Sequence, residues 1–457
     1  MDTVRINEKD NVCVDKSTGH KIALCDIKKG EEIIKYGYPI GNASADIKKG
    51  ESVHSHNMKT GLSANLSYEY NPRFTIPEPL TPFEIEAYIR KNGDIGIRND
   101  IWIVPTVGCV NSTAKILAEK TGAICFSHPY GCSQLGCDNK ITQLILKGLI
   151  KHPNAGGVLV LGLGCENNNI GEMKKVLGEW DKERILFLNT QDTEDEIAEG
   201  VSLIEKLKKT ASADVREKVS ASKLRIGLKC GGSDGFSGIY ANPVVGKVTD
   251  SLCAMGASAV LTEVPEMFGA EQVLLERCIN EEVFEKGVKL INNFKNYFRS
   301  HNQPVSENPS PGNKEGGITT LEEKSLGCVQ KGGKAPVVDV LDYGDTVTKQ
   351  GLNLLNGPGN DIVSVTNLSA AGCHMVLFTT GRGTPLGGAV PTVKIASNNV
   401  IAEKKPHWID FSAWGDNIDA NAEKLLHLIK ETSDGKETNN EKNGCREIAI
   451  FKDGVTL

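Results

Sequence analysis

The chain of 457 residues contains thirteen cysteines but no C-x-x-C pair. The closest two, Cys132 and Cys137, are separated by four residues, so zinc ribbons and the common ferredoxin cluster runs are not visible. The odd number of cysteines fits a reducing compartment, in which we expect thiols, metal ligands or nucleophiles and no disulfides.

The sequence also lacks the segments that direct a chain to a membrane or out of the cell. No window approaches the roughly 18 to 20 apolar residues of a membrane helix, and the first residues contain no apolar h-region. We therefore expect a cytoplasmic protein without membrane contacts. A net charge of -6 gives no reason to expect nucleic acid, and neither G-x-G-x-x-G nor a P-loop is present, which disfavours nucleotide binding.

The length predicts two to four domains, and the pattern of residues changes along the chain. Residues 11–57 contain short apolar runs separated by glycines, and Asp26–Glu31 nearly repeats as Asp46–Glu51, which indicates a small β-rich module. Prolines at 72, 77, 79 and 82 predict an extended linker. We expect a first domain over 1–70, a linker over 71–85, and α/β domains over 86–238 and 239–457.

From Phe83 onwards, apolar runs of strand length alternate with amphipathic segments. Strands are predicted at 101–105, 123–126, 157–161, 184–188 and 224–228, with helices between them. Thr193 to Glu196 has the form of a capping box that opens a helix to about Lys209. Continuous apolar strands alternating with helices predict a largely parallel α/β sheet covered on both faces. The same alternation continues less clearly after Gly238.

The stretch from Glu51 to Asn57 places His54 and His56 two positions apart. If Val53 ends a strand, alternation puts both imidazoles on one face, where they can bind a divalent metal. The alternative is that two polar residues close a strand at the surface.

Four cysteines follow predicted strands in glycine-containing loops: Cys109, Cys132, Cys165 and Cys230. Because ligands gather at the carboxyl ends of parallel strands, these four side chains are expected to converge on one crevice. Three of them could hold an iron–sulfur cluster, or one could be a nucleophile. The alternative is that cysteine is a small apolar residue that fits tight turns.

Two further stretches offer charged groups after predicted strands. Glu263 and Glu266 could act as acid, base or ligand, although the pattern favours solvated or capping carboxylates over that role. Arg382 lies between two glycines, and its guanidinium could hold a substrate carboxylate or lie at the surface.

Long blocks in one order resemble the altronate/galactarate dehydratase family of sugar-acid lyases. They include Gly19 to Ala23, Val53 to Asn57, Pro105 to Cys109, Cys230 to Gly235, Asn308 to Lys314 and Thr379 to Gly383, and the likeness spans nearly the whole chain. In this family the N-terminal module is a SAF domain of the β-clip kind. Residues 105–111 and 128–136 are more similar to the altronate-specific members, while galactarate dehydratases and sulfolactate sulfo-lyases share the architecture.

The resemblance implies dehydration of a sugar acid, such as D-altronate to 2-dehydro-3-deoxy-D-gluconate, with iron(II) as cofactor and manganese(II) as a substitute. On this hypothesis His54 and His56 bind the metal, and His20 is a third ligand or an acid–base group. Lys21 or Lys35 is the base if burial lowers its pKa, with Glu263 as a further catalytic candidate.

Arg382, Ser233 and Asp234 are then expected to hold the small-molecule sugar acid, in a protein that we expect to be a homo-oligomer. A galactarate dehydratase, a non-catalytic sugar-acid binding protein and an enzyme whose Lewis acid is an iron–sulfur cluster remain alternatives.

Overall fold

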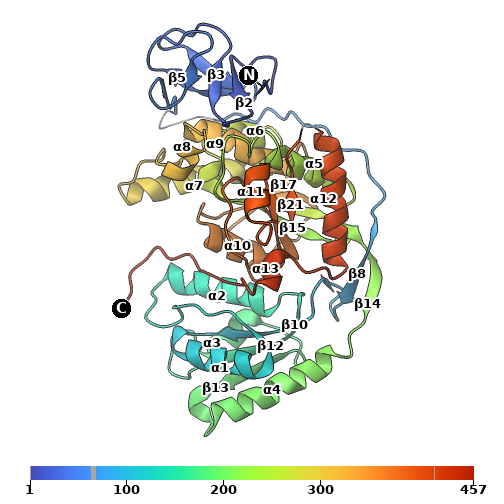
Figure 1. Cartoon of the computed structure of the whole chain (residues 1–457). Helices are drawn as coiled ribbons and strands as arrows, with labels where there is room; N and C mark the ends of the chain where they lie inside the picture. The colour runs from blue at the N-terminus through green and yellow to red at the C-terminus, as the bar shows by residue number, and fades with distance from the viewer. Residues whose placement is uncertain (1, 63–67, 416) are drawn as a thin grey trace.

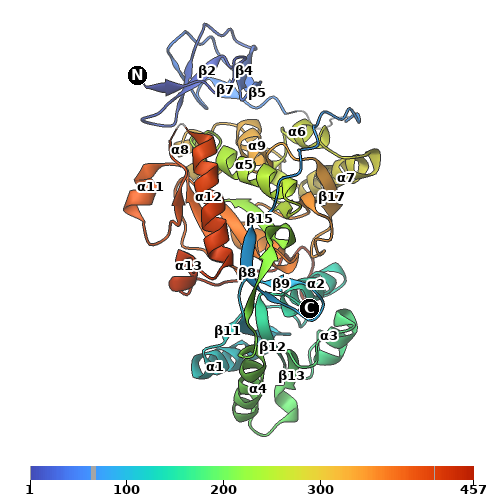
Figure 2. The ribbon, with the colours of Figure 1, turned by 90° about the vertical axis from the view of Figure 1, so that its right-hand side faces the viewer.

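The chain folds into three units stacked along one axis, as a computed structural model describes it for residues 2–62, 68–415 and 417–457. The N-terminal β-rich unit lies at one end, a large α/β unit in the middle, and a smaller α/β unit at the other end (Figures 1 and 2). This arrangement confirms the expected α/β class with largely parallel sheets, preceded by a small β-rich module.

Two antiparallel sheets form the N-terminal unit. One has the order β1 (Thr3–Val4), β2 (Val12–Asp15), β3 (Lys21–Ala23), β6 (Ser52–Val53), and the other has the order β4 (Glu32–Lys35), β5 (Tyr38–Ala43), β7 (Met58–Lys59). The near repeat in the sequence pairs with itself, because Ile27 and Ile47 bond to each other through their backbones and are both buried. The repeat therefore builds a common core for the two sheets.

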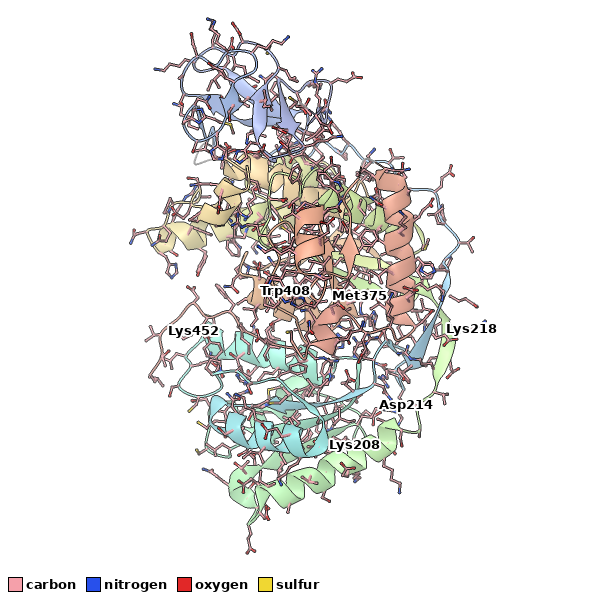
Figure 3. All side chains as sticks on the ribbon, in the orientation of Figure 1. Lys208, Asp214, Lys218, Met375, Trp408 and Lys452 are labelled. Carbon is pink, nitrogen blue, oxygen red and sulfur yellow. The ribbon has the colours of Figure 1, made fainter. Side chains whose placement is uncertain are left out.

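An antiparallel sheet joins the middle unit to the smaller unit. Its order is β14 (Arg216–Ser220), β8 (Glu84–Ile89), β9 (Ile95–Gly96), and the described residues 68–83 before it contain no helix or strand. β8 and β14 pass between the two α/β units in Figure 2. Asp214 lies at this joint, where it binds Arg90 at 3.0 Å and Arg184 at 2.5 Å (Figure 3).

The smaller α/β unit has a four-stranded parallel sheet. Its order is β11 (Ile124–Cys125), β10 (Asp100–Pro105), β12 (Ala155–Gly162), β13 (Ile185–Asn189), and its helices are α1 (Asn111–Thr121), α2 (Cys137–Ile150), α3 (Ile170–Leu177) and α4 (Glu196–Ala211). The predicted strands and helices of this stretch are confirmed. The predicted capping box is wrong, because Asp195, not Thr193, accepts the amides of Ile197 and Ala198 at the start of α4.

The middle unit has a seven-stranded parallel sheet whose central strand is β15. The order is β17 (Val337–Leu341), β18 (Gly351–Leu355), β16 (Ser258–Leu261), β15 (Arg225–Cys230), β19 (Met375–Thr380), β20 (Thr392–Ala396), β21 (Phe411–Ser412). We predicted that β15 continues the first parallel sheet; instead it pairs with β16 and β19. An apolar run identifies a strand but not the strand with which it pairs. The predicted boundary after residue 238 therefore places β15 in the same domain as the four-stranded sheet, whereas β15 pairs within the seven-stranded sheet.

Helices cover both faces of the large sheet (Figures 1 and 2). They are α5 (Ala241–Ala254), α6 (Glu271–Leu275), α7 (Glu281–Ser300), α8 (Pro311–Glu315), α9 (Leu321–Cys328), α10 (Asp361–Ala370), α11 (Asn399–Lys404), α12 (Ile418–Ser433) and α13 (Asn439–Lys442). Helices α8 and α9 lie at the end of the unit that faces the N-terminal β sheets. No helix within the described ranges is both long and apolar enough to cross a membrane.

Candidate active site

Two lysines of the N-terminal unit share one carboxylate of the middle unit. Lys21 Nζ donates to Glu323 Oε2 and Lys35 Nζ donates to Glu323 Oε1, each at 2.8 Å. Lys21 Nζ also donates to Gly317 O and to Thr319 Oγ1 at 2.8 Å. All three charged side chains are at most 1% exposed, so this ion triad lies inside the interface between the two units.

The triad separates the pKa values of its two lysines. Burial lowers the pKa of Lys21 to about 8, although Glu323 opposes this shift. For Lys35 burial acts in the same direction, but Glu323 and Tyr36 outweigh it and raise the pKa above its usual value. Burial would raise the pKa of Glu323, yet the two lysines lower it to about 2. Lys21 is therefore the lysine that can lose a proton near neutral pH.

His20 and His54 lie at the rim of the same interface. Their ring centroids are 5.4 Å apart, and His54 Nε2 lies 2.9 Å from Lys314 O, at the end of α8. The backbone of the N-terminal unit approaches very closely here, because a Cβ on Gly235 would lie 2.1 Å from Gly19 O. Glycine at this position is needed to seat His20 against the middle unit.

Arg382 and the loop of Ser233 border the same rim. Arg382 Nη2 lies 3.0 Å from Glu315 Oε2, and the side chain is 45% exposed. Ser233 O accepts from Asn313, and Asp234 is buried with bonds from Ser397 Oγ at 2.8 Å and Asn398 Nδ2 at 2.8 Å. Burial raises the pKa of Asp234, although these donors oppose the shift. Asp234 thus shapes the loop, while Arg382 faces solvent.

A second buried charge cluster lies behind this rim, at the carboxyl ends of β15 and β16. Glu263 binds Lys229, and its other oxygen lies 3.3 Å from Lys331 Nζ and accepts Cys230 N at 3.1 Å. Its backbone is left-handed, with φ of 71°, a conformation that non-glycine residues adopt mainly where the surroundings enforce it. Burial raises the pKa of Glu263 against the effect of the two lysines.

Glu266 and two thiols form the innermost part of this cluster. Glu266 Oε2 lies 3.0 Å from Cys328 Sγ and 3.2 Å from Cys230 Sγ, and the two sulfurs are 3.3 Å apart. The other oxygen, Oε1, binds Lys324 at 2.8 Å, and this ion pair lowers the pKa of Glu266 against the effect of burial. Among the described residues, this is the group whose three metal-ligating atoms lie within 4.8 Å of one another, so it could bind a metal.

The structure does not place His54 and His56 within a strand, as the predicted pattern required. Strand β6 ends at Val53 and the chain then turns, so the alternation that the hypothesis needed stops before His54. His56 is exposed, and His54 has protein oxygens at both ring nitrogens, Ser55 Oγ at 3.0 Å and Lys314 O at 2.9 Å. His54 instead lies beside His20, and the metal role of the His54–His56 pair stays a prediction.

The expected convergence of four cysteines is wrong for Cys230. Cys109, Cys132 and Cys165 are exposed in loops of the smaller α/β unit, whereas Cys230 is buried in the middle unit. The reason is the sheet pairing, since β15 belongs to the seven-stranded sheet and ends at another edge.

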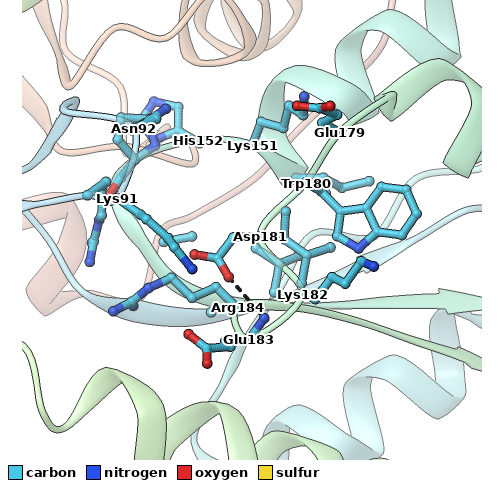
Figure 4. Close-up of a pocket in the computed structure, with 17 residues that line it drawn as sticks. Lys91, Asn92, Lys151, His152, Glu179, Trp180, Asp181, Lys182, Glu183 and Arg184 are labelled. Carbon is cyan, nitrogen blue, oxygen red and sulfur yellow. Dashed lines mark hydrogen bonds between the residues drawn. The ribbon is translucent and has the colours of Figure 1, made fainter.

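A cavity of about 830 Å³ lies elsewhere (Figure 4). It is lined by residues that precede β12 and β13, including Lys151, His152, Trp180 and Glu183, so it opens at the amino ends of these strands. His152 is buried and bonded to Cys373 O, and burial lowers its pKa to about 3. Ligands of parallel sheets gather at the opposite edge, so this cavity is a weak candidate for chemistry.

Sequence reasoning missed several charged residues of the site. Lys229, Glu323, Lys324, Lys331 and Cys328 were not singled out, although all are buried. No local signal marked them. In the structure the residues of α9, Leu321–Cys328, are all buried and include three charged side chains. Charged residues are seldom buried unless they are paired, and these belong to an internal ion network that the sequence pattern does not show.

The structure is that of a multidomain α/β protein with buried clusters of charged side chains at and beside a domain interface. Three family models match the chain: the altronate/galactarate dehydratase SAF domain over 15–61, the D-galactarate dehydratase/altronate hydrolase second domain over 87–212, and the D-galactarate/altronate dehydratase C-terminal domain over 221–456. The chain belongs to the D-galactarate/altronate dehydratase family.

Similar proteins agree with this assignment. The chain is 53% identical to the altronate dehydratase of Bacillus subtilis (strain 168), over 99% of this chain and 94% of the relative. It is also 53% identical to the altronate dehydratase of Escherichia coli (strain K12), over 97% and 93%. Identity to the galactarate dehydratase (L-threo-forming) of Escherichia coli (strain K12) is 33%, over 95% and 89%.

Proposed function

We propose that the protein is a hydro-lyase that removes water from D-altronate to give 2-dehydro-3-deoxy-D-gluconate, a step of hexuronate breakdown. The observation that carries the proposal is Lys21, a buried amine whose pKa of about 8 suits a base, within a chain 53% identical to two altronate dehydratases. The lower identity of 33% to a galactarate dehydratase favours altronate over galactarate.

The reaction needs a base for the C2 proton and an acid for the leaving C3 hydroxyl. In the proposed mechanism, neutral Lys21 takes the proton next to the carboxylate, and the proton that Lys21 has taken then passes to the C3 hydroxyl as it leaves as water, with His20 at the rim of the interface beside it. The enol that results tautomerises to the 2-keto-3-deoxy acid.

The charges of the interface suit an anionic substrate. Five buried lysines (Lys21, Lys35, Lys229, Lys324 and Lys331) face three buried glutamates (Glu263, Glu266 and Glu323), and the partly exposed Asp361 also pairs with Lys229. With every lysine protonated the difference, five minus four, is one positive charge. Neutral Lys21 removes that charge, so the partly exposed Arg382 supplies the positive charge that a substrate carboxylate needs. We propose that Arg382 holds that carboxylate in a bidentate pair while Ser233 and Asp234 fix the loop below it.

A divalent metal fits the donors of Cys230, Glu266 and Cys328. Its binding would replace two thiol protons with one dication, so the charge of the buried cluster would stay the same. Thiolate ligands suit iron(II) better than manganese(II), and we propose iron(II) as the ion. When bound, it would supply positive charge as a Lewis acid to an enediolate that forms beside it.

Substrate entry requires movement of the N-terminal unit. The cavity bordered by Tyr36, Ser233, Asp234 and Glu323 has a volume of about 10 Å³, which holds no more than a water molecule. Because residues 68–83 form no helix or strand, the N-terminal unit can lift from the middle unit to admit a sugar acid.

The test is an anaerobic assay of the full chain with iron(II), in which formation of a 2-keto-3-deoxy acid is measured across aldonates and aldarates. We expect D-altronate to have the highest kcat/KM. A higher value for galactarate would make the protein a galactarate dehydratase, and tight binding of altronate without release of water would make it a binding protein.

A further inference from the structure

We infer that Cys109, Cys132 and Cys165 of the smaller α/β unit together bind a four-iron, four-sulfide cluster through three thiolates. The inference goes beyond the proposed dehydration and does not depend on turnover of altronate. It concerns a different unit from the one that holds Lys21 (Figure 1).

Exposure sets these cysteines apart from the others. Five of the thirteen cysteines are exposed, namely Cys25, Cys109, Cys132, Cys137 and Cys165, and four of these five lie in the loops at one edge of one sheet. Free cysteine is among the most buried residue types, so several exposed thiols at one place indicate ligands or reactive groups and not packing.

The three loops leave neighbouring strands in the same direction. β10 is the middle strand, with β11 on one side and β12 on the other, and all three run parallel. Adjacent strands lie about 4.8 Å apart, so loops that follow three adjacent strands begin within about 10 Å of one another. In each loop the cysteine directly follows a glycine, at Gly108, Gly131 and Gly164.

Direct contacts hold the three loops together. Gly108 N donates to Tyr130 O at 2.9 Å, and Asn168 N donates to Gly131 O at 3.0 Å. A Cβ on Gly131 would lie 2.0 Å from Thr106 O, so the second loop rests directly on the end of β10. Glu166 fixes the third loop, because it accepts Thr106 Oγ1 at 2.7 Å and Leu163 N at 3.0 Å.

Unpartnered polar atoms lie beside Cys132. Gln134 Oε1 accepts Gly131 N, but Gln134 Nε2 is buried without a partner, and Asn168 Oδ1 on the other side of Gly131 is also buried without a partner. Gln134 is 4% and Asn168 0% exposed. Buried polar groups in native proteins nearly always have partners, and the N–H groups of Gln134 suit the anionic sulfurs of a cluster, whereas the Asn168 oxygen, an acceptor, does not.

A cluster explains the arrangement better than a single ion. The sulfurs of Cys109, Cys132 and Cys165 are not among the groups of ligand atoms that lie within 4.8 Å of one another, as the ligands of a single ion must. In a cluster each thiolate binds a different iron, so the ligand sulfurs can lie farther apart. Binding of a preassembled cluster releases one proton from each thiol, forms three Fe–S bonds and changes no oxidation state. The fourth iron then has an oxygen ligand from solvent in place of a thiolate.

Cys137 is not part of the proposed set. It begins α2, beyond the backbone bridge between Gln134 and Thr456 of the C-terminal tail. Cys137→Ser is therefore a matched control in the same surface region, and Cys25→Ser is a control in the N-terminal unit.

The experiment measures iron and acid-labile sulfide in the full chain after anaerobic reconstitution with iron(III), sulfide and an excess of a small thiol, which reduces the part of the iron that the cluster holds as iron(II). We expect about four sulfides and about five irons per chain, four of the irons in the cluster and one at Cys230, Glu266 and Cys328, with the broad visible absorption of sulfide-to-iron charge transfer. Cys109→Ser, Cys132→Ser and Cys165→Ser are each expected to lower sulfide at least about tenfold, since even loss of an outer contact costs that much in affinity. The melting curve by circular dichroism shows that each variant is folded.

Two controls locate the cluster. Cys137→Ser and Cys328→Ser are both expected to keep all the sulfide. Cys328→Ser is expected to lose only the single iron proposed at Cys230, Glu266 and Cys328, which has no sulfide with it. Iron without sulfide, full sulfide in any of the three ligand variants, or loss of sulfide in Cys137→Ser would overturn the assignment.

Oxidation with ferricyanide, followed by EPR, tests separately whether three thiolates hold the cluster. Ferricyanide takes one electron from the cluster, and an iron without a thiolate then leaves as Fe²⁺, so a three-iron cluster with its own EPR signal remains. We expect the EPR signal of the three-iron cluster to appear after ferricyanide has removed one electron per cluster. A cluster that stays intact under this treatment would contradict the three-thiolate site.

Discussion

Lys21 and Lys35 share one carboxylate, but their pKa values are shifted in opposite directions. Both are buried and both bind Glu323 at 2.8 Å, but Lys21 donates to two neutral oxygens as well, whereas Lys35 lies beside Tyr36. Burial therefore dominates at Lys21 and lowers its pKa to about 8, while the charged partners dominate at Lys35. The sequence named both as bases on the condition of a lowered pKa, and only Lys21 meets that condition.

The pH dependence of turnover follows from this pKa. Lys21 acts as a base only when it has lost its proton, so kcat/KM for altronate should rise about tenfold per pH unit below pH 8 and level off above it. The measurement is a pH–rate profile from pH 6 to 10. A profile that is flat between pH 6 and 9 would contradict the role of Lys21.

At the scale of elements, α4 allows a direct comparison of two candidate caps. Asp195 accepts Ala198 N at 2.8 Å, whereas Thr193, the cap that the sequence pattern suggested, makes no bond to the helix. Asp195→Ala should cost about 1 kcal/mol of local stability and speed hydrogen exchange in the first turn of α4. Thr193→Ala should leave exchange unchanged, and equal effects of the two changes would contradict the assigned cap.

Elements could be predicted from the sequence where the pattern is local. The strands at 101–105, 157–161 and 184–188 were found because continuous apolar runs of that length are buried on both faces. The partner of β15 was not found, since its apolar run fits either parallel sheet equally well. The wrong expectation that Cys230 converges with the other three cysteines on one crevice followed from that error.

The candidate site was only partly predictable for a related reason. Glu263 and Arg382 stood out because one follows a strand and the other lies between glycines, and Lys21 was named through the family resemblance. Lys229, Lys331 and Glu323 did not, because a lysine or glutamate is normally at the surface and only long-range packing buries it. Each of these side chains is paired with a residue at least 30 positions away, a distance that local patterns do not report.

At the scale of the whole molecule, Glu323 joins the N-terminal unit to the middle unit. Glu323→Gln would leave Lys21 and Lys35 buried without their carboxylate, and breaking a buried pair costs about 3 to 5 kcal/mol. We expect the N-terminal unit to open more often, with faster proteolysis within residues 68–83. Asp46→Asn is the control, because its partner Lys28 and Asp46 itself are both more than half exposed, and it should change the cleavage rate little.

If Glu323→Gln were cleaved at the same rate as the unchanged chain, the triad would not hold the two units together. Bound altronate should slow this cleavage, because in the proposed complex it contacts both Lys21 of the N-terminal unit and Arg382 of the middle unit.

The most direct test of the account compares Lys21→Arg with Lys35→Arg in the anaerobic altronate assay. Both changes keep a positive charge beside Glu323, but arginine cannot act as a base because it stays protonated. We predict that kcat falls by about 10² to 10⁴ in Lys21→Arg and by less than about tenfold in Lys35→Arg. Equal losses in the two variants, or full activity in Lys21→Arg, would contradict the assignment of this interface as the active site.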